Sequence, residues 1–302
     1  MTGPAVEFLD PDGIDFVEHP APVLTPGERT GVDRLWAETT ARNPAAFDGQ
    51  VVASLGVERH AAGPLVVRWA AVPYRMRGLR ALRAAERVPG SLFVTVLLPC
   101  EGDGEEGGEV GLVVGRGSAA TAAPGRWTLP GGAVEPPPAG QALDMTALRG
   151  HAARELVEET GVEVPGEKLE PWGLTRGRRF GSLGFHFLAP PLPKALVRST
   201  HAALAHAPAP LSAPGGDAAA EPELDALAFV PSSAAAERLG PGADYLPQLL
   251  DRYFLMTGAP AARMPGPGRP GPELPGPGMP GQGMPGPGMP GPGKSGLSTN
   301  GG

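Results

Sequence analysis

The first ninety residues alternate between helical and strand patterns. Between residues 26 and 43, one set of side chains recurs near helical spacing: Val32, Leu35, Trp36 and Thr39. The stretches 50–57 (Q-V-V-A-S-L-G-V) and 63–72 (G-P-L-V-V-R-W-A-A-V) are short apolar runs rich in valine, which is typical of strands. We therefore expect residues 1–90 to form a small α+β segment.

The pattern becomes rich in predicted strands from Ser91 onward. Two apolar runs, 91–99 and 110–116, flank an acidic, glycine-rich turn and predict a hairpin. The runs 169–176 and 182–190 predict a second pair of strands, and the amphipathic run from Tyr245 to Leu255 predicts a closing helix. The Ala/Pro-rich stretch 202–220 predicts an inserted flexible loop.

A basic stretch from Tyr74 to Arg87 separates these two regions. One interpretation is a helix that binds phosphate or an acidic partner, because guanidinium groups match phosphate oxygens. The other is a solvated helix face with Leu79 and Leu82 turned inward, and we assign no site to the stretch. Its arginines are Arg75, Arg77, Arg80, Arg83 and Arg87.

The stretch 154–161 (R-E-L-V-E-E-T-G) places Glu155, Glu158 and Glu159 three and four residues apart. On a helix these carboxylates share one face and repel one another unless a positive charge lies among them. Oxygen-only clusters suit Mg²⁺ or Mn²⁺. The alternative is an acidic helix face exposed to solvent, which is common.

The flanking residues favour the metal interpretation. Upstream, an apolar run ends at Pro130-Gly131-Gly132, a strong turn signal that lets another group approach the backbone closely. Downstream, Gly161 stands where a glycine often ends a helix. The pattern therefore predicts a loop, a helix and a second loop.

These residues resemble the box of the Nudix hydrolase superfamily, written G-x5-E-x7-R-E-U-x-E-E-x-G-U with U a bulky aliphatic residue. The second half of the box matches at each fixed position, and Gly132 matches its first glycine. The matching residues are Arg154, Glu155, Leu156, Glu158, Glu159, Gly161 and Val162.

The chain departs from the box in one place. Arg154 stands 22 positions after Gly132, which implies an insertion of about eight residues relative to the motif. Prolines 136–138 make this insertion a loop, and Asp144 or Thr146 is placed to cap the helix that follows. The first glutamate of the box has no clear counterpart. A similar opening with an enlarged loop recurs in the UDP-glucose pyrophosphatase branch of the superfamily.

The resemblance implies an α/β fold, an α/β/α sandwich with a mixed β-sheet over residues 91–258. It implies Glu155, Glu158 and Glu159 as ligands of Mg²⁺ (or Mn²⁺). Glu158, Glu159 and Arg154 are the implied catalytic residues, while Gly131, Gly132 and Gly161 shape the loops. The implied activity is a pyrophosphohydrolase that cleaves the diphosphate bridge of a nucleoside diphosphate linked to another moiety, with a nucleotide sugar favoured.

Two further groups are candidates for the site. Arg176, Arg178 and Arg179 lie beside Phe180 in a predicted turn, where they would clamp a phosphate and a base or sugar; an ordinary turn with exposed charges is the alternative. In many Nudix relatives a glutamate on a later loop binds metal or acts as a base. Glu221 and Glu223 are the candidates for that role.

Composition limits the class of partner. The formal net charge of −7 disfavours nucleic acid. Cys100 is the single cysteine and cannot form an internal disulfide, so we expect a reducing compartment, a cytoplasmic location and no membrane span. Abundant Ala, Gly, Pro and Arg is typical of bacterial genomes rich in GC. The expected partner is a small nucleotide derivative, and residues 1–90 would shape its pocket or a homodimer contact.

The last region, residues 259–302, repeats M-P-G-P-G and predicts a disordered tail, because this composition cannot build a core. Two other functions are open. One is a Nudix-like regulatory domain that senses a nucleotide derivative without cleaving it. The other is an interaction scaffold that depends on the tail.

Overall fold

The computed structural model describes residues 6–9, 13–59, 63–102, 108–204 and 222–258. Most of the predicted loop 202–220, Glu221 and the predicted tail 259–302 lie outside these residues. In the described part no helix is long and apolar enough to cross a membrane.

The larger sheet has seven strands in the order β1-β9-β10-β5-β3-β4-β2. It is mixed, because β10 runs parallel to β5 and β2 runs parallel to β4, while the other pairs are antiparallel. The pairing of β9 with β10 confirms the second predicted hairpin. The strands are β1 (Val6–Leu9), β2 (Ile14–Glu18), β3 (Gln50–Arg59), β4 (Leu65–Pro73), β5 (Gly90–Leu97), β9 (Glu170–Gly177) and β10 (Leu183–Leu188).

This sheet continues across the expected boundary between residues 90 and 91. Strands β2, β3 and β4 come from the N-terminal segment, and β3 pairs with the beginning of β5. Together with β1, which pairs with β9, the predicted α+β segment thus contributes four strands to the same sheet as the strands that follow it.

The smaller sheet has the order β11-β6-β7-β12, and β8 pairs with β7. Here the first predicted hairpin is partly wrong: β6 pairs with β7, but β5 pairs with β3 and β10 instead. Pro99 begins the new strand, and because proline has no N–H to donate it often stands at a strand start. The strands are β6 (Pro99–Gly102), β7 (Gly108–Gly117), β8 (Trp127–Thr128), β11 (Leu192–Pro193) and β12 (Leu224–Val230).

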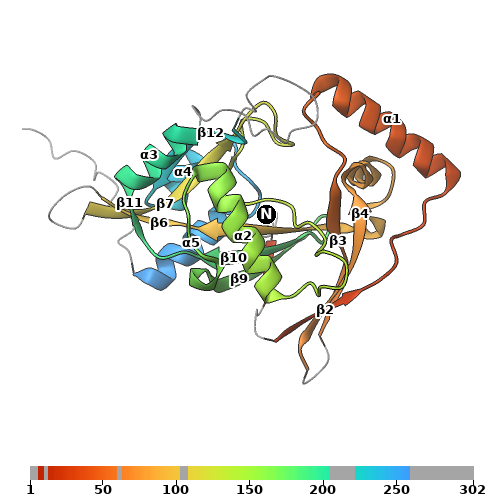
Figure 1. Cartoon of the computed structure of the whole chain (residues 1–302), viewed down its shortest axis with the longest axis horizontal. Coiled ribbons are helices and arrows are strands. Elements are labelled where there is room, and N and C mark those ends of the chain that lie inside the picture. The colour runs from red at the N-terminus through yellow and green to blue at the C-terminus, as the bar shows by residue number, and fades with distance from the viewer. Residues whose placement is uncertain (1–5, 10–12, 60–62, 103–107, 205–221, 259–302) are drawn as a thin grey trace, which may run out of the picture. The chain divides into compact units, whose positions relative to one another are not determined.

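Helices cover the sheets on two sides (Figure 1). Helix α2 packs on a core that includes Val94 and Val113, and α5 packs on a second core that includes Leu112 and Val114. Because side chains alternate along a strand, neighbours in β7 face opposite cores. The fold is therefore an α/β/α arrangement, as predicted. The helices are α1 (Pro26–Arg42), α2 (Met145–Thr160), α3 (Lys194–Leu204), α4 (Ser233–Glu237) and α5 (Leu246–Thr257), with 3₁₀ turns η1 (Tyr74–Ala81), η2 (Ala85–Arg87) and η3 (Gly166–Lys168).

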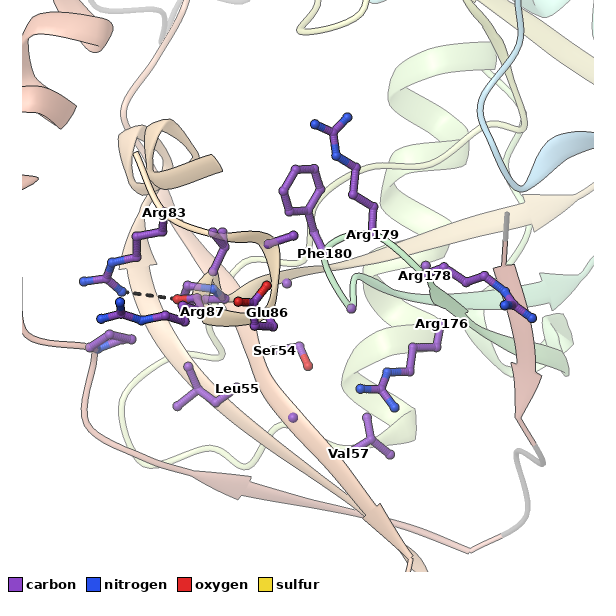
Figure 2. Close-up of a pocket in the computed structure, with 18 of the residues that line it drawn as sticks. Ser54, Leu55, Val57, Arg83, Glu86, Arg87, Arg176, Arg178, Arg179 and Phe180 are labelled. Atoms are coloured by element: carbon purple, nitrogen blue, oxygen red, sulfur yellow. Dashed lines mark hydrogen bonds between the residues drawn. The ribbon is translucent and has the colours of Figure 1, made fainter. Parts of the chain in front are cut away.

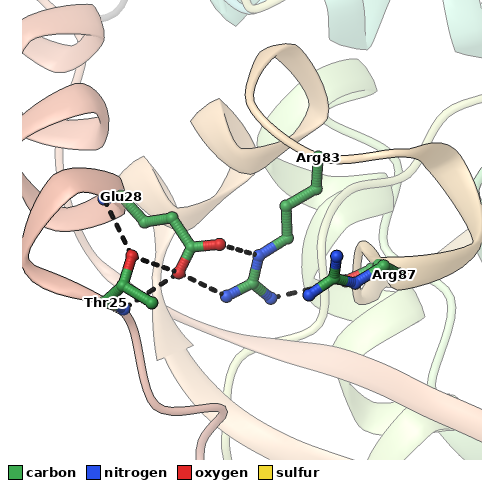
Figure 3. Close-up of polar contacts among 4 residues, drawn as sticks. All are labelled: Thr25, Glu28, Arg83 and Arg87. Atoms are coloured by element: carbon green, nitrogen blue, oxygen red, sulfur yellow. Dashed lines mark hydrogen bonds and ion pairs between the residues drawn. The ribbon is translucent and has the colours of Figure 1, made fainter.

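The basic stretch 74–87 differs from the predicted solvated helix. It forms η1 and η2, and Leu79 is fully buried whereas Leu82 is exposed. Arg83 is largely buried in an ion pair with Glu28 of α1, with Arg83 Nε 2.6 Å from Glu28 Oε1. Glu28 also completes a capping box with Thr25, so a single carboxylate caps α1 and fixes the basic stretch (Figure 3).

Candidate active site

The glycine-rich loop lies beside β5 and is fixed by backbone hydrogen bonds. The N–H groups of Val94 and Val96 donate to the carbonyls of Gly132 and Pro130, at 3.0 and 2.8 Å. Gly131 has φ +145°, and a Cβ there would lie 2.1 Å from the carbonyl oxygen of Val94. Only glycine fits this position, because the clash is with backbone and the dihedral is unfavourable for other residues.

Local signals set both ends of α2. The Asp144 carboxylate accepts a hydrogen bond of 2.7 Å from the N–H of Ala147, so Asp144, not Thr146, is the N-cap. Gly161 ends the helix in the left-handed conformation, with φ +69°. The predicted loop, helix and loop are all present.

The three box carboxylates occupy different environments. Glu159 is almost fully buried, and its Oε2 accepts a hydrogen bond of 2.7 Å from the N–H of Gly131. Glu155 is partly buried, lies against Gly132 and has Oε1 2.9 Å from Nε2 of His151. Glu158 is exposed to solvent. Two carboxylates of the helix thus lie against the two loop glycines: Glu159 against Gly131, and Glu155 against Gly132.

Negative charge in this cluster is only partly compensated. Desolvation raises the pKa of the Glu159 carboxyl well above its ordinary value, and the charge of Glu155 adds to the effect against the opposing hydrogen bond from Gly131. Desolvation and the charge of Glu155 also raise the pKa of Glu158, which Arg154 partly opposes. These carboxylates therefore favour a nearby positive charge.

A fourth carboxylate, Glu223, joins the cluster from the end of the chain segment that leads into β12. Desolvation raises the pKa of Glu223, and the charges of Glu155 and Glu158 raise it further. Of the two glutamates expected on this loop, Glu223 is therefore electrostatically coupled to the box, and Glu221 lies outside the described residues.

Arg154 organises the outer side of the cluster. Its Nη2 lies 2.9 Å from Glu135 Oε2 and 2.6 Å from His151 Nδ1, and its Nε lies 3.7 Å from Glu158 Oε1. The expected pairing with Glu158 is present but long, and the closer carboxylate partner is Glu135, at the end of the glycine loop.

Sequence reasoning missed His151 as part of this network. Its ring is buried, with Nε2 3.0 Å from the carbonyl oxygen of Ala133 and 2.9 Å from Glu155. Because Arg154 donates to Nδ1, the hydrogen lies on Nε2, where both neighbours are acceptors. The four-residue spacing of His151 and Glu155 is the signal that would have found it.

The donor set fits a hard divalent cation in its chemistry. Four coupled carboxylates offer only oxygen donors, which suit Mg²⁺ or Mn²⁺. As the side chains stand, no three His, Cys, Asp or Glu residues in the described ranges converge closely enough to hold an ion. The carboxylates of Glu155 and Glu159 are instead turned to His151 and Gly131.

The predicted arginine clamp lies elsewhere. Arg176, Arg178 and Arg179 line a cavity of about 940 Å³ together with Arg83 and Arg87 (Figure 2). Among the described residues that line it, none belongs to the box. The structure therefore brings the three arginines together with one another and with the basic stretch, and places the box residues in a separate group.

No family model matches the chain, and no curated protein matches it significantly. Solved structures do. A mutT/nudix family protein from Listeria innocua is 22% identical, with a TM-score of 0.37 over 57% of this chain and 97% of that one. The MutT protein from Methanosarcina mazei Go1 is 19% identical, with a TM-score of 0.34 over 55% and 94%. The NUDIX domain of Shewanella oneidensis NrtR, complexed with ADP ribose, is 18% identical, with a TM-score of 0.33 over 56% and 88%.

This chain resembles Nudix proteins. Two of these structures carry the name of the superfamily whose box the sequence motif resembles. The descriptions of these three Nudix structures name no nucleotide sugar, so the resemblance to the UDP-glucose pyrophosphatase branch stays a prediction.

Proposed function

We propose that the protein is a Nudix-type, divalent-metal-dependent hydrolase that cleaves the diphosphate bridge of a nucleoside diphosphate linked to another moiety. The observation that carries the proposal is the carboxylate cluster: Glu159 and Glu155 lie against the loop glycines, and the charge of Glu155 adds to desolvation in raising the pKa values of Glu158, Glu159 and Glu223. A diphosphate repels nucleophiles because its oxygens are negative. Carboxylates alone would add to that repulsion, so the site requires a cation.

Glu155, Glu158 and Glu159 would hold Mg²⁺ or Mn²⁺, which would supply the positive charge that neutralises the bridging phosphates. The other residues of the chain then have distinct tasks. Arg154 holds Glu158 near Glu135, and His151 holds Glu155. Glu223, whose pKa is raised, suits a general base that accepts the proton of the attacking water.

The test is a product screen. The protein is incubated with Mg²⁺ or Mn²⁺ and a panel of nucleotide sugars, ADP-ribose, dinucleoside polyphosphates and nucleoside triphosphates. Nucleotide sugars are tested first because of the enlarged box loop. We expect cleavage that needs the cation and falls at least about a thousandfold in Glu158→Gln, because the variant loses a charged ligand.

Glu163→Gln is the matched control, because Glu163 is exposed just beyond the box helix. It should retain full activity. Retained activity in Glu158→Gln would reject the metal-ligand assignment. Absence of cleavage across the panel, with one of its compounds raising the melting temperature, would instead favour the non-catalytic regulator.

A further inference from the structure

The cavity beside the arginines lies just before the start of β5, where the segments on either side of β5 continue without a strand between them. Strand β5 begins at Gly90, but on one side β3 continues from Ser54 to Arg59. On the other side, the turn that joins β9 to β10 extends past the first residue pair of β10 and β5, Leu183 and Leu92. The space between these two flanks is the cavity of about 940 Å³, a volume suited to a small-molecule ligand.

The lining of this cavity is basic. Five arginines and two glutamates line it. One arginine, Arg83, is paired with Glu28, which leaves a formal excess of two positive charges. Figure 2 shows Arg83 and Arg87 on one side and Arg176, Arg178 and Arg179 on the other. The last three and Arg87 are exposed, so their guanidinium groups are available to a ligand.

A further guanidinium lies behind the lining without a carboxylate partner in the described ranges. Arg80 packs on the ring of Phe180, 5.0 Å from its centroid, and Arg179 packs on the same ring at 4.8 Å. Arg80 Nη2 donates to Ser91 Oγ at 2.9 Å, while its buried Nε has no hydrogen-bond partner among the described residues. Desolvation, and then the charge of Arg77, lowers the pKa of Arg80 to about 10. This arginine adds an uncompensated positive charge next to the cavity.

The basic stretch is held rigidly against the cavity. Both Nε and Nη2 of Arg83 donate to the Glu28 carboxylate, at 2.6 and 2.9 Å, and its Nη1 donates to the carbonyl of Arg87 (Figure 3). Glu28 is in turn fixed by the helix cap at Thr25. Arg83 therefore positions the loop that carries Arg87, and its own charge is already neutralised.

We propose that this cavity is a second binding site, specific for a small molecule that carries phosphate groups, and that it works without a metal ion. Arginine forks match phosphate oxygens, and several forks around one cavity fit a diphosphate better than a single anion. The two sites are opposite in charge, because the box presents carboxylates and the cavity presents guanidinium groups. A phosphate group therefore binds at the cavity unaided but requires a cation at the box.

The test is calorimetric titration of the full chain with inorganic pyrophosphate in the presence of EDTA. Chelation removes divalent cations, so the box carboxylates repel the probe and any binding reports the cavity. We expect binding that weakens as salt rises. Arg176→Ala and Arg178→Ala should each reduce the affinity about tenfold or more, because each removes charge-assisted hydrogen bonds. Arg178→Lys keeps the charge and should lose less.

Arg238→Ala removes an exposed arginine that does not line the cavity, and it should bind like the wild type. The melting temperature without pyrophosphate shows that each variant is folded. Binding that is unaffected by Arg176→Ala and Arg178→Ala, or no binding at all, would overturn the proposal. Phosphate binding at the cavity does not depend on hydrolysis, so a negative product screen would not contradict it.

The phosphate groups that bind here belong either to the hydrolase substrate or to a separate effector. A competition experiment distinguishes the two. If the site holds the far end of the hydrolase substrate, pyrophosphate should raise the KM for that substrate without changing kcat, and Arg178→Ala should raise it as well. If the site holds a separate effector, pyrophosphate should change kcat. Either result supports phosphate binding at the cavity, and equal responses of wild type and Arg178→Ala to pyrophosphate would contradict it.

Discussion

The buried carboxylate of Glu159 accepts a hydrogen bond of 2.7 Å from the backbone N–H of Gly131, 28 positions earlier in the chain. This contact joins the glycine-rich loop to the last turn of α2, and it spans the enlarged loop that separates the two halves of the box. Leaving a buried donor or acceptor without its partner is costly. The hydrogen bond therefore fixes the position of the helix relative to β5.

Replacement of Gly131 by alanine should be severely destabilising. A Cβ would lie 2.1 Å from the Val94 carbonyl oxygen and 2.6 Å from Thr95 Cα, at a φ of +145° that alanine rarely adopts. Overpacking and backbone strain add, so we expect a loss of about 3 kcal/mol or more in the free energy of unfolding. Urea denaturation followed by circular dichroism measures it.

Gly150→Ala is the matched control and should have the opposite sign. Gly150 lies inside α2 and is exposed, and a Cβ there meets no atom within 4 Å beyond the helix's own backbone. Alanine in a helix interior should stabilise the protein by about 0.5 to 1 kcal/mol. If alanine changed the free energy of unfolding equally at Gly131 and Gly150, the glycine-rich loop would not lie as close to β5 as the structure shows.

The role of Glu159 in the fold can be separated from its charge. Glu159→Gln keeps an oxygen that accepts from Gly131 and removes one charge from a crowded carboxylate cluster. In EDTA we expect its stability to equal or exceed that of the wild type. Glu159→Ala leaves the Gly131 N–H without its acceptor and should cost about 1 to 3 kcal/mol. Chemical denaturation of both variants measures the difference, and a Gln variant as unstable as the Ala variant would contradict the role of this hydrogen bond.

The sequence predicts the parts of the site that depend on local chemistry. Gly161 is identifiable, and the N-cap is narrowed to Asp144 or Thr146, because capping uses residues within one turn of the helix end; the structure shows Asp144. The apolar run 91–99 predicts a single strand and does not show that β5 and β6 enter different sheets. An apolar run shows that a strand is buried, but the partner of that strand depends on contacts between distant segments.

The separation of the arginines from the box was not predictable for the same reason. Arg176 lies near the end of β9, and Arg178 and Arg179 lie in the turn that follows it. The sequence predicted either a phosphate clamp or an ordinary turn with exposed charges for these arginines. It could not show that the N-terminal strand β3 and the basic stretch complete their surroundings. The ion pair between Arg83 and Glu28 joins residues 55 positions apart, and no periodicity reports it.

The pairing of Glu28 with Arg83 should make the N-terminal region sensitive to acid. The hydrogen bond from Arg83, and then the one from the Thr25 backbone, lowers the pKa of Glu28 from 4.5 to about 2. The folded state therefore holds Glu28 ionised when the unfolded state is already protonated. The stabilisation is complete above pH 4.5 and is lost as the pH falls toward 2.

Glu28→Gln should therefore flatten the fall of the melting temperature between pH 4.5 and pH 3. Thr25→Ala is the comparison, because it removes the cap at a cost of about 1 kcal/mol but keeps the ion pair. It should be less stable at every pH while retaining a fall close to that of the wild type. If the melting temperatures of Glu28→Gln and the wild type fell equally with pH, the ion pair would not contribute to stability in this range.

A buried histidine should contribute to the response to milder acid. His186 is fully enclosed between two threonines, with Nδ1 2.7 Å from Thr95 Oγ1 and Nε2 2.8 Å from Thr175 Oγ1. Desolvation lowers its pKa from 6.5 to about 3. The nearest ionisable ring, Tyr245, is buried too, and its pKa is raised, so it stays neutral and does not offset a charge on His186.

The sign follows from proton uptake. Below pH 6.5 the unfolded chain protonates His186 while the folded protein keeps it neutral, so stability falls as the pH decreases toward 3. Between pH 7 and pH 5 this one group should remove about 2 kcal/mol from the free energy of unfolding. His186→Gln keeps hydrogen-bonding atoms for the threonines and cannot protonate. Its stability, measured by urea denaturation at pH 7, 6 and 5, should therefore change by about 2 kcal/mol less than that of the wild type across this range. Parallel pH profiles for the two proteins would mean that His186 is protonated in the folded state and that its burial between Thr95 and Thr175 is incomplete.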